Sequence, residues 1–345
     1  MAGPYKPLVE CLPAAKLADR PKDWWQTVLG VVRFGQPRRA PEHPDIPVAS
    51  TGLRKLGPGT DTCEVWQCAQ PLVSGHSGYL RYRAGPQVLF GCIEIRESLL
   101  PPRAAEGLTS IQQATYRAYA EIFSTLDRLG YPHLLRIWNY LPEINRDTPH
   151  GERYRQFNSG RRSAFLAHQR VVESAVPAAC ALGSPAGAPL VVYFLASPAP
   201  ARTLENPRQV SAYHYPQEYG PDSPTFSRAA VASQGLGNLL LISGTASVVG
   251  HRTVHPGDAG AQAGEAMMNI AALVDGANEL LSAGAFSMQT LQYKVYVRHP
   301  ADAPAIRHLM AQRLPLGPPT TYLQADICRS DLLVEIEAAG SPAPA

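Results

Sequence analysis

The chain has 345 residues, a formal net charge of +3, and 45% hydrophobic residues. Its length predicts about two domains, and its apolar content is enough for two cores, which excludes a fibre or a disordered tail. The small net charge argues against a nucleic-acid partner, and no segment approaches the ~18 consecutive apolar residues of a membrane span.

Cysteine spacing and the amino terminus indicate the compartment. The six cysteines contain no Cys-x-x-Cys pair, and the first residues show no charged segment followed by a long apolar run. We therefore expect reduced thiols and a cytoplasmic protein. Glycine and proline are concentrated in residues 1–70, 183–207 and the last few positions, which predicts loops, a linker and a frayed end.

The first half of the chain predicts an ordered series of elements after residue 86. These are a strand at 87–96, a helix at 110–129, a strand at 133–140, a helix at about 162–174, and strands near 178–183 and 190–195. The order is β-α-β-α-β-β.

The second half predicts the same order again. Its elements are a strand at 236–245, a helix at 261–283 that Gly284 ends, a strand at 290–298, a helix at 303–312, and strands at 319–327 and 332–338. An internal repeat explains both halves. Two helices can cover only one face of each sheet, so the other face must pack against another sheet.

We therefore expect an α+β protein with two tandem β-α-β-α-β-β modules packed sheet to sheet. The N-terminal module, with an irregular extension, is expected at 1–200, and the C-terminal module at 201–345. Ligand clefts are expected where the modules meet.

Glu335 is the first candidate catalytic residue, because it lies inside an apolar run that includes Val334 and Ile336. A buried carboxyl group with a raised pKa is a natural proton donor. The alternative is structural: Glu335 and Glu337 share one face of a strand, and a carboxylate pair on one face is usually solvated.

An arginine-rich stretch at 151–165, GERYRQFNSGRRSAF, is a candidate anion site. Arg155 and Arg161 could grip carboxylates through their guanidinium groups, with Tyr154 beside them. The alternative is a solvated helix start.

A second cluster at 211–229, SAYHYPQEYGPDSPTFSRA, has the same character. Its phenols Tyr213 and Tyr219 and its cation Arg228 could contact an anionic ligand. The alternative is an interface loop whose aromatic rings only pack.

Two further features complete the candidate site. Arg298 ends the strand QYKVYVR, where a side chain can face a ligand, and Gly244 in the SGTA turn allows close backbone approach. The HxxxH pair at 251–255 lacks a glutamate between its histidines, so no metal site is expected. P-loop, GxGxxG and GxSxG motifs are absent from the sequence.

The segments SGTA, QAGEAMMNIAALVDGANELL, QYKVYVR and PTTYLQADICRSDLLVEIEA together resemble the carboxy-terminal signature of the RidA/YjgF/chorismatase superfamily. This resemblance implies RidA/YjgF-like (chorismate-mutase-like) modules whose sheets form a central barrel. ERYRQFNSGRRSAF and RIWNYLPEIN resemble the chorismatases in particular. RidA-type imine hydrolases carry a carboxylate-binding arginine where this chain has Thr320 and Thr321, which disfavours that activity.

The resemblance to chorismatases implies chorismate as the small-molecule substrate and no cofactor. Glu335 is then the acid that protonates the enolpyruvyl methylene group. Arg155 and Arg161 would hold one carboxylate, and Arg228 or Arg298 the other. Pyruvate is expected whether the chorismatase forms a hydroxybenzoate or a dihydroxycyclohexadiene acid.

The resemblance also implies a product. Members that form 3-hydroxybenzoate carry a glycine and a cysteine in the site, and Gly244 and Cys328 match this pair. A branch that also forms 4-hydroxybenzoate stays open. The alternatives are a chorismate hydrolase that forms a dihydroxycyclohexadiene acid, a RidA-like imine or enamine hydrolase, and a non-catalytic binding module. The assembly is expected to be a monomer or a homotrimer, without a nucleic-acid or membrane partner.

Overall fold

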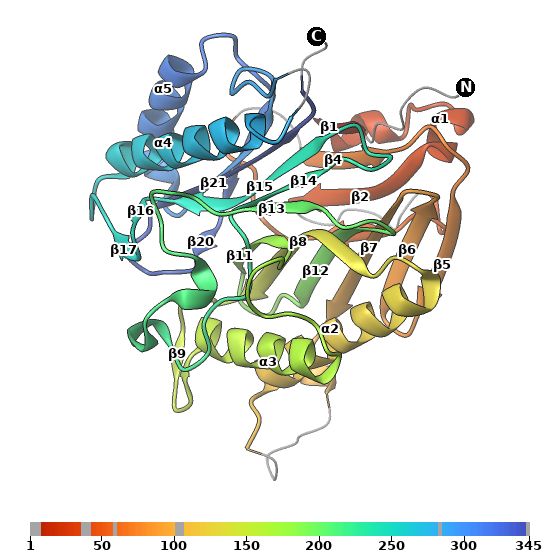
Figure 1. Cartoon of the computed structure of the whole chain (residues 1–345), viewed down its shortest axis with the longest axis horizontal. Coiled ribbons are helices and arrows are strands. Elements are labelled where there is room, and N and C mark those ends of the chain that lie inside the picture. Colours follow the sequence, from red (N-terminus) through yellow and green to blue (C-terminus); the bar gives the residue numbers. More distant parts are fainter. Residues whose placement is uncertain (1–7, 36–42, 58–60, 101–106, 282–284, 343–345) are drawn as a thin grey trace.

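The two predicted modules are present in the computed structural model, which describes residues 8–35, 43–57, 61–100, 107–281 and 285–342 (Figure 1). The middle sheet contains, in spatial order, β20 (Asp326–Ile327), β11 (Ala178–Ser184), β8 (His133–Pro142), β12 (Leu190–Ser197), β7 (Val88–Ile95), β6 (Leu80–Gly85) and β5 (Val73–Ser77). The C-terminal sheet contains β13 (Arg202–Leu204), β14 (Ala229–Ala232), β15 (Leu239–Ala246), β21 (Val334–Gly340), β18 (Gln292–Val297) and β19 (Thr320–Gln324).

Two helices cover the outer face of each of these sheets (Figure 1). They are α2 (Ser110–Leu129) and α3 (Arg153–Ala167) on the middle sheet, and α4 (Ala259–Asn278) and α5 (Ala303–Arg313) on the C-terminal sheet. Strands β8 and β11 pair in parallel, as do β18 and β19. All other neighbouring strands of these two sheets pair antiparallel. The predicted repeat of β-α-β-α-β-β modules is confirmed.

A third sheet is formed by residues that we expected to be loops. It contains β1 (Leu8–Pro13), β4 (Thr62–Gln67), β2 (Val28–Phe34) and β3 (Val48–Ser50), with the short helix α1 (Lys22–Gln26) beside it. The prediction of loops for 1–70 was wrong because the glycines and prolines lie mostly between short apolar strands. Two small ribbons, β9 (Asp147–Thr148) with β10 (Gly151–Glu152) and β16 (Val248–Val249) with β17 (Arg252–Thr253), lie outside the three sheets.

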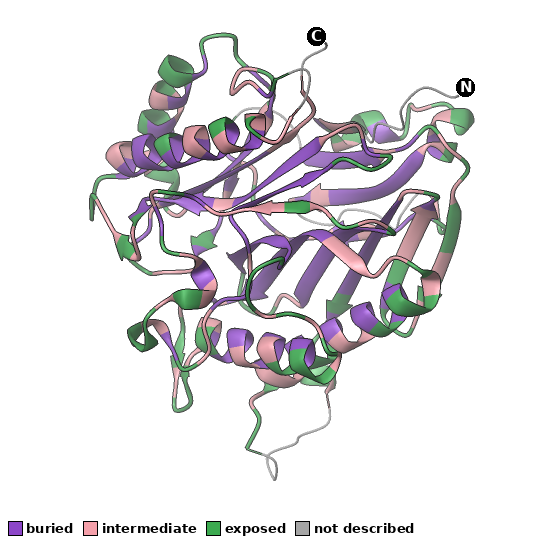
Figure 2. Cartoon of the chain, in the orientation of Figure 1, coloured by how far each residue is buried: buried purple, intermediate pink, exposed green. Residues whose placement is uncertain are grey.

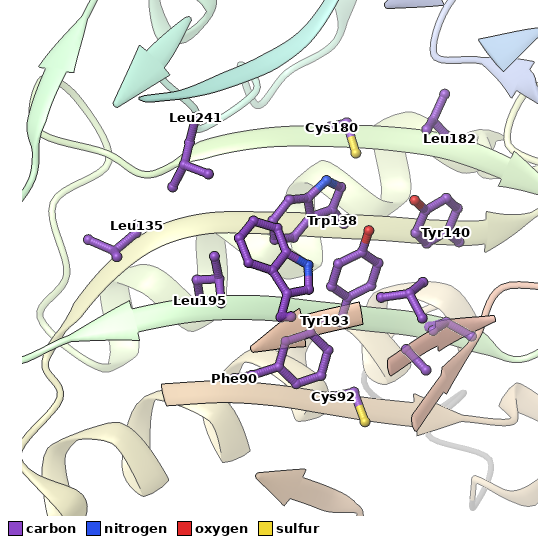
Figure 3. Close-up of a cluster of buried hydrophobic side chains, with 14 of the residues drawn as sticks. Phe90, Cys92, Leu135, Trp138, Tyr140, Cys180, Leu182, Tyr193, Leu195 and Leu241 are labelled. Atoms are coloured by element: carbon purple, nitrogen blue, oxygen red, sulfur yellow. The ribbon is translucent and has the colours of Figure 1, made fainter. Parts of the chain in front are cut away.

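The three sheets meet around one central core. Alternate residues of β15 show why: Leu240 and Ile242 pack under the helices, and Leu239 and Leu241 point into the central core. Buried residues continue along the strands of all three sheets (Figure 2). Aromatic side chains fill the middle of this core, with Trp138 stacked on Tyr193 at a ring distance of 4.5 Å (Figure 3).

The helix α3 differs from its prediction by nine residues at its start. It begins at Arg153, whereas we expected a helix at about 162–174. Asn158, Ser159 and Gly160 are weak helix formers, but tertiary packing overrides this preference. A β-carbon on Gly160 would lie 2.5 Å from the backbone oxygen of Gln112, so glycine lets α3 approach α2 closely.

Candidate active site

A cavity of about 880 Å³ lies between the middle and C-terminal modules. It is lined by the first turns of α3, the centre of β11, the end of β15, and segments around residues 209–228 and 328–332. Of the predicted site residues, eight line the cavity: Tyr154, Arg155, Arg161, Tyr219, Arg228, Gly244, Cys328 and Glu335.

Glu335 reaches this cavity from the inner face of β21. Val334, Ile336 and Ala338 pack on the helix side of the sheet, so the alternate residues Glu335 and Glu337 point inward. Both glutamates are 3% exposed. The interpretation of this pair as a solvated face is therefore wrong, because the inner face of β21 is covered by the other sheets.

Gly244 makes room for the Glu335 side chain. The pairing of β15 with β21 shifts between Ile242 and Thr245, which places a bulge at Ser243 and Gly244. A β-carbon on Gly244 would lie 1.9 Å from Glu335 Oε1 and 2.9 Å from the β-carbon of Cys180. Any side chain at this position would displace the carboxyl group.

The preceding residue, Ser243, joins the two modules at the same point. Its hydroxyl donates to the backbone oxygen of Ser227 at 2.5 Å and accepts from the backbone nitrogen of Ala179 at 2.9 Å. The SGTA sequence thus holds β15 against β11 where the cavity begins.

Glu335 has the electrostatic properties of an acid. Burial and the negative charge of Glu337 raise the pKa of Glu335 to about 8, against the opposing effects of Arg136 and Arg228. Its Oε1 atom is buried and has no hydrogen-bond partner among the described residues. A pKa of about 8 favours the protonated form of the carboxyl group at neutral pH.

Within the part of the chain that the structure describes, three arginines that line the cavity have a buried nitrogen without a hydrogen-bond partner: Arg161, Arg228 and Arg329. Arg161 donates to Asn158 Oδ1 at 3.2 Å, but its Nε finds no acceptor among the described residues. Arg228 donates to the Val210 oxygen and to Tyr215 Oη, both at 2.8 Å, and its Nε likewise has no described acceptor. Buried N–H groups without acceptors are costly, so these groups are suited to an anionic ligand.

Aromatic rings hold Arg329 in the cavity lining. Its guanidinium lies 4.0 Å from the ring centre of Tyr219 and 5.0 Å from that of Tyr215. Nη1 donates to the His251 oxygen at 2.9 Å, whereas the buried Nη2 has no hydrogen-bond partner among the described residues. Tyr219 therefore lines the cavity and also orients Arg329 by a cation–π contact.

Two thiols line the cavity near Glu335. Burial and the charge of Glu335 raise the pKa of Cys328 to about 12. Burial also raises the pKa of Cys180. Both groups are neutral at physiological pH, so they shape the cavity as small, uncharged side chains rather than as nucleophiles.

The structure does not bring Arg298 or Tyr213 to the cavity. Arg298 donates to Asp326 Oδ1, Asn145 Oδ1 and the backbone oxygens of Leu332, Ile327 and Arg329. Its guanidinium group donates to acceptors of the protein itself, and two of these bonds hold the backbone of the 328–332 segment. Tyr213 packs edge-on against His214 and is absent from the cavity lining.

Other arginines of the 151–170 region serve the structure. Arg153 is buried in an ion pair with Glu97, Arg162 faces Asp222, and Arg170 pairs with Asp127. Arg155 is exposed at the rim, where it donates to the backbone oxygen of Glu218 at 3.0 Å. Among the described arginines of this group, only Arg161 is buried, lines the cavity and has a nitrogen without a described partner.

Sequence reasoning missed Arg329, Cys180 and Gln209. Arg329 follows Cys328 directly, and this adjacency was the available signal. Cys180 lies in an apolar strand, and Gln209 lies in a loop, so neither carries a distinguishing pattern. Gln209 donates to the Val248 oxygen at 3.0 Å, and its Oε1 is buried without a partner.

Among the described residues, no group of three or more His, Cys, Asp or Glu side chains could hold a metal ion. His251 lies 3.3 Å from Tyr219 Oη, and His255 lies 3.4 Å from Glu265 Oε2, so the two histidines face different partners. No helix within the same ranges is long and apolar enough to cross a bilayer.

Residues 64–196 match a family described as "Chorismatase FkbO/Hyg5-like, N-terminal". A chorismatase of Streptomyces rapamycinicus is 36% identical over 338 residues, which cover 93% of this chain and 95% of that protein. A 3-hydroxybenzoate synthase of Streptomyces hygroscopicus is 42% identical over 234 residues, or 65% of this chain and 68% of that protein.

The solved structures add a match over nearly the whole length. A crystal structure of a chorismatase aligns with a TM-score of 0.84 and 30% identity, covering 97% of this chain and 98% of that chain. The three-sheet arrangement is therefore shared with a known enzyme structure, including the N-terminal sheet that the sequence did not reveal.

Proposed function

This chain belongs to the chorismatase family, and from this premise we propose that it is an enzyme that converts chorismate into 3-hydroxybenzoate and pyruvate. The observation that carries the proposal is Glu335, a buried acid without a hydrogen-bond partner at Oε1, in a cavity that is also lined by three arginines with free nitrogens. An uncharged proton donor beside anion-binding groups suits a dianionic substrate that must be protonated on carbon.

We assign the cavity arginines to two anion-binding regions. Arg228 and Arg329, which both contact the Tyr215 ring, form one, and Arg161 from α3 forms the other. Chorismate has a ring carboxylate and an enolpyruvyl carboxylate, so each region would take one of them. Because guanidinium groups bind carboxylates through parallel hydrogen bonds, this arrangement would fix the enol ether between them.

The chemical step starts with proton transfer from Glu335 to the methylene carbon of the enolpyruvyl group. This transfer forms a carbon–hydrogen bond and leaves an oxocarbenium ion, which the Glu335 carboxylate stabilises. The hydroxyl oxygen of the substrate then forms a bond to the neighbouring ring carbon that carries the ether, and the ether bond breaks and releases pyruvate. The resulting protonated arene oxide opens at the original C–O bond of the hydroxyl group, and its oxygen keeps the hydroxyl proton. Transfer of a ring proton to the Glu335 carboxylate restores the acid and gives the aromatic product, so substrate and products balance without water.

The walls beside Glu335 support an internal attack rather than hydrolysis. Cys328 and Cys180 are uncharged and Gly244 has no side chain, so no polar side chain at these three positions can hold a water beside the cation. We propose that Gly244 and Cys328 direct the cation toward 3-hydroxybenzoate. Water capture would instead give the dihydroxycyclohexadiene acid.

The central core is enclosed by three sheets of a single chain, which supports a monomeric assembly. We propose that the enzyme is active as a monomer. Light scattering coupled to size exclusion, at the concentration used for activity, tests this; a trimer that loses activity on dilution would contradict it.

Incubation of the purified protein with chorismate tests the activity. Chromatography should detect 3-hydroxybenzoate and pyruvate in equal amounts. The Glu335→Gln variant is the matched control, because it keeps the shape of the site and removes the transferable proton. Pyruvate with a dihydroxycyclohexadiene acid would assign a hydrolase instead, and an absence of pyruvate would overturn the proposal.

A further inference from the structure

A chain of buried charges crosses the central core and joins all three sheets. Arg136 on β8 pairs with Glu337 on β21 at 2.6 Å, and Glu337 pairs with Lys294 on β18 at 2.6 Å. Lys294 also pairs with Glu64 on β4 at 2.7 Å. All four side chains are buried, so water does not screen these contacts.

The buried ion pairs hold Glu337 in its ionised form. In addition to its two cations, it accepts hydrogen bonds from Trp138 Nε1 at 2.9 Å and from Tyr296 Oη at 3.2 Å. Burial alone would raise the pKa of Glu337, but Lys294 and Arg136 lower it below the usual value. Its carboxylate is therefore a fixed negative charge in the middle of the core.

The four buried charges of this network balance one another without Glu335. Two carboxylates, Glu64 and Glu337, face two cations, Lys294 and Arg136. Glu335 lies two residues from Glu337 on the same face of β21 and has no ion pair among the described residues. A charge on Glu335 would add an uncompensated carboxylate next to an ionised one, which is unfavourable in a buried site.

We propose that Glu337 is a positioning residue that keeps Glu335 in its acid form through its fixed charge, without touching the substrate. The inference rests on the proposed function in that Glu335 is taken as the proton donor. It assigns a role to Lys294 and Arg136 as well, because they hold Glu337 ionised. These buried ion pairs thus couple the packing of the three sheets to the protonation of Glu335.

Other titratable or charged groups also face Glu335. They come from β8, β11, β18, α3 and the cavity walls: Arg136, Cys180, Tyr296, Tyr154, Arg228 and Cys328. Burial raises the pKa of both thiols and both phenols, which therefore stay neutral. The charges that act on Glu335 are then Glu337, which favours its acid form, and the two arginines, which oppose it.

The experiment measures the protonation of Glu335 directly and needs no substrate. Infrared difference spectra between the wild type and Glu335→Gln, recorded across pH, isolate the carbonyl band of the protonated acid. The same titration in Glu337→Gln should show a midpoint lower by at least about one pH unit, because the charge that favours the acid form is gone. An unchanged midpoint would overturn the proposal.

Glu64→Gln is the matched control. It removes a carboxylate from the same chain of charges, but Glu64 lies beyond Lys294 in the N-terminal sheet. We expect its shift of the Glu335 midpoint to be less than half of that in Glu337→Gln. Equal shifts in the two variants would overturn the local role of Glu337 and leave only a structural role for the chain of charges.

The wild-type spectrum alone provides a further test. If Glu337→Gln does not fold, the wild type alone decides, because Glu335 must be protonated and Glu337 ionised at about pH 6.5. A carboxylate at Glu335 under these conditions would overturn the proposal. The infrared result is independent of chorismate turnover, so failure of the proposed reaction and failure of this inference are distinguishable.

Discussion

Glu335 Oε1 lies only 1.9 Å from the position that a β-carbon on Gly244 would take. The two residues come from neighbouring strands, β21 and β15, and the bulge in β15 brings the glycine under the carboxyl group. The orientation of the acid in the cavity therefore depends on the absence of a side chain at residue 244.

Gly244→Ala tests this dependence. The added methyl group must displace the Glu335 carboxyl group, and a misplacement of about 1 Å can reduce turnover roughly 100-fold. We expect this loss, with destabilisation of about 1–3 kcal/mol from overpacking. Steady-state kinetics and chemical denaturation measure the two effects. Gly276→Ala is the control, because its β-carbon would lie 3.8 Å from its nearest neighbour, and its turnover should be unchanged.

Glu335→Gln should lower turnover by at least about 100-fold, since the amide cannot supply the proton. The protein should still fold, because the amide has nearly the same shape as the acid. Circular dichroism and single-turnover assays with chorismate measure fold and chemistry separately. Glu279→Gln, at an exposed position after α4, is the control. Near-normal turnover in Glu335→Gln would contradict the assignment of the acid.

The raised pKa of Glu335 predicts a loss of activity at alkaline pH. Because the reacting form is the protonated one, kcat/KM should decrease as the pH rises through about 8. The decrease should be tenfold for each pH unit above the midpoint. A profile that stays flat to about pH 10 would mean that the acid form of Glu335 is not required.

The same pKa predicts how stability depends on pH. The ordinary pKa of the group is 4.5 and the folded value is about 8, so the folded state binds more protons than the unfolded state between these limits. Its contribution to the free energy of unfolding is therefore fully present below 4.5 and is lost as the pH rises to about 8, with a slope of up to about 1.4 kcal/mol per pH unit. Denaturation of the wild type and Glu335→Gln across this range should show a difference that grows with pH in favour of the variant. A constant difference would contradict the raised pKa.

Removal of a cavity arginine should weaken chorismate binding. In the inactive Glu335→Gln background, calorimetry with Arg161→Met or Arg329→Met should show a loss of about 2–5 kcal/mol if the ion pair with the substrate is buried. Arg202→Met, which removes an exposed arginine outside the cavity lining, is the control. Unchanged affinity in both cavity variants would exclude them as the carboxylate-binding groups.

Cys328→Ala should change the product more than the rate. The smaller side chain leaves space for a water beside Glu335, so a dihydroxycyclohexadiene acid should appear next to 3-hydroxybenzoate, while pyruvate release changes less than about tenfold. Chromatography of both acids gives the ratio. Cys92→Ala, a buried thiol of β7 outside the cavity lining, is the control. An unaltered product mixture would mean that Cys328 only packs in the cavity wall and does not direct the product.

Periodicity and local signals were enough for the repeat in the last three quarters of the chain. Helix α2 has the bounds that its pattern predicts, because Thr109 and Gln112 form a capping box and Gly130 ends the helix with a φ of 78°. The alternation along β21 also predicts correctly that Glu335 and Glu337 share a face. These features depend on neighbours in sequence, which is why they can be read without a structure.

The character of that shared face depends on residues far away in sequence. The face is buried because sheets from residues 8–67 and 73–197 close over it, and strand periodicity cannot tell a solvent-facing side from one covered by another sheet. The same long-range packing separates Glu337, which meets Arg136 and Lys294, from Glu335, which meets no cation within ion-pair distance among the described residues. The sequence alone thus identifies the two glutamates, and the third sheet and its buried cations make one of them a fixed charge and the other an acid.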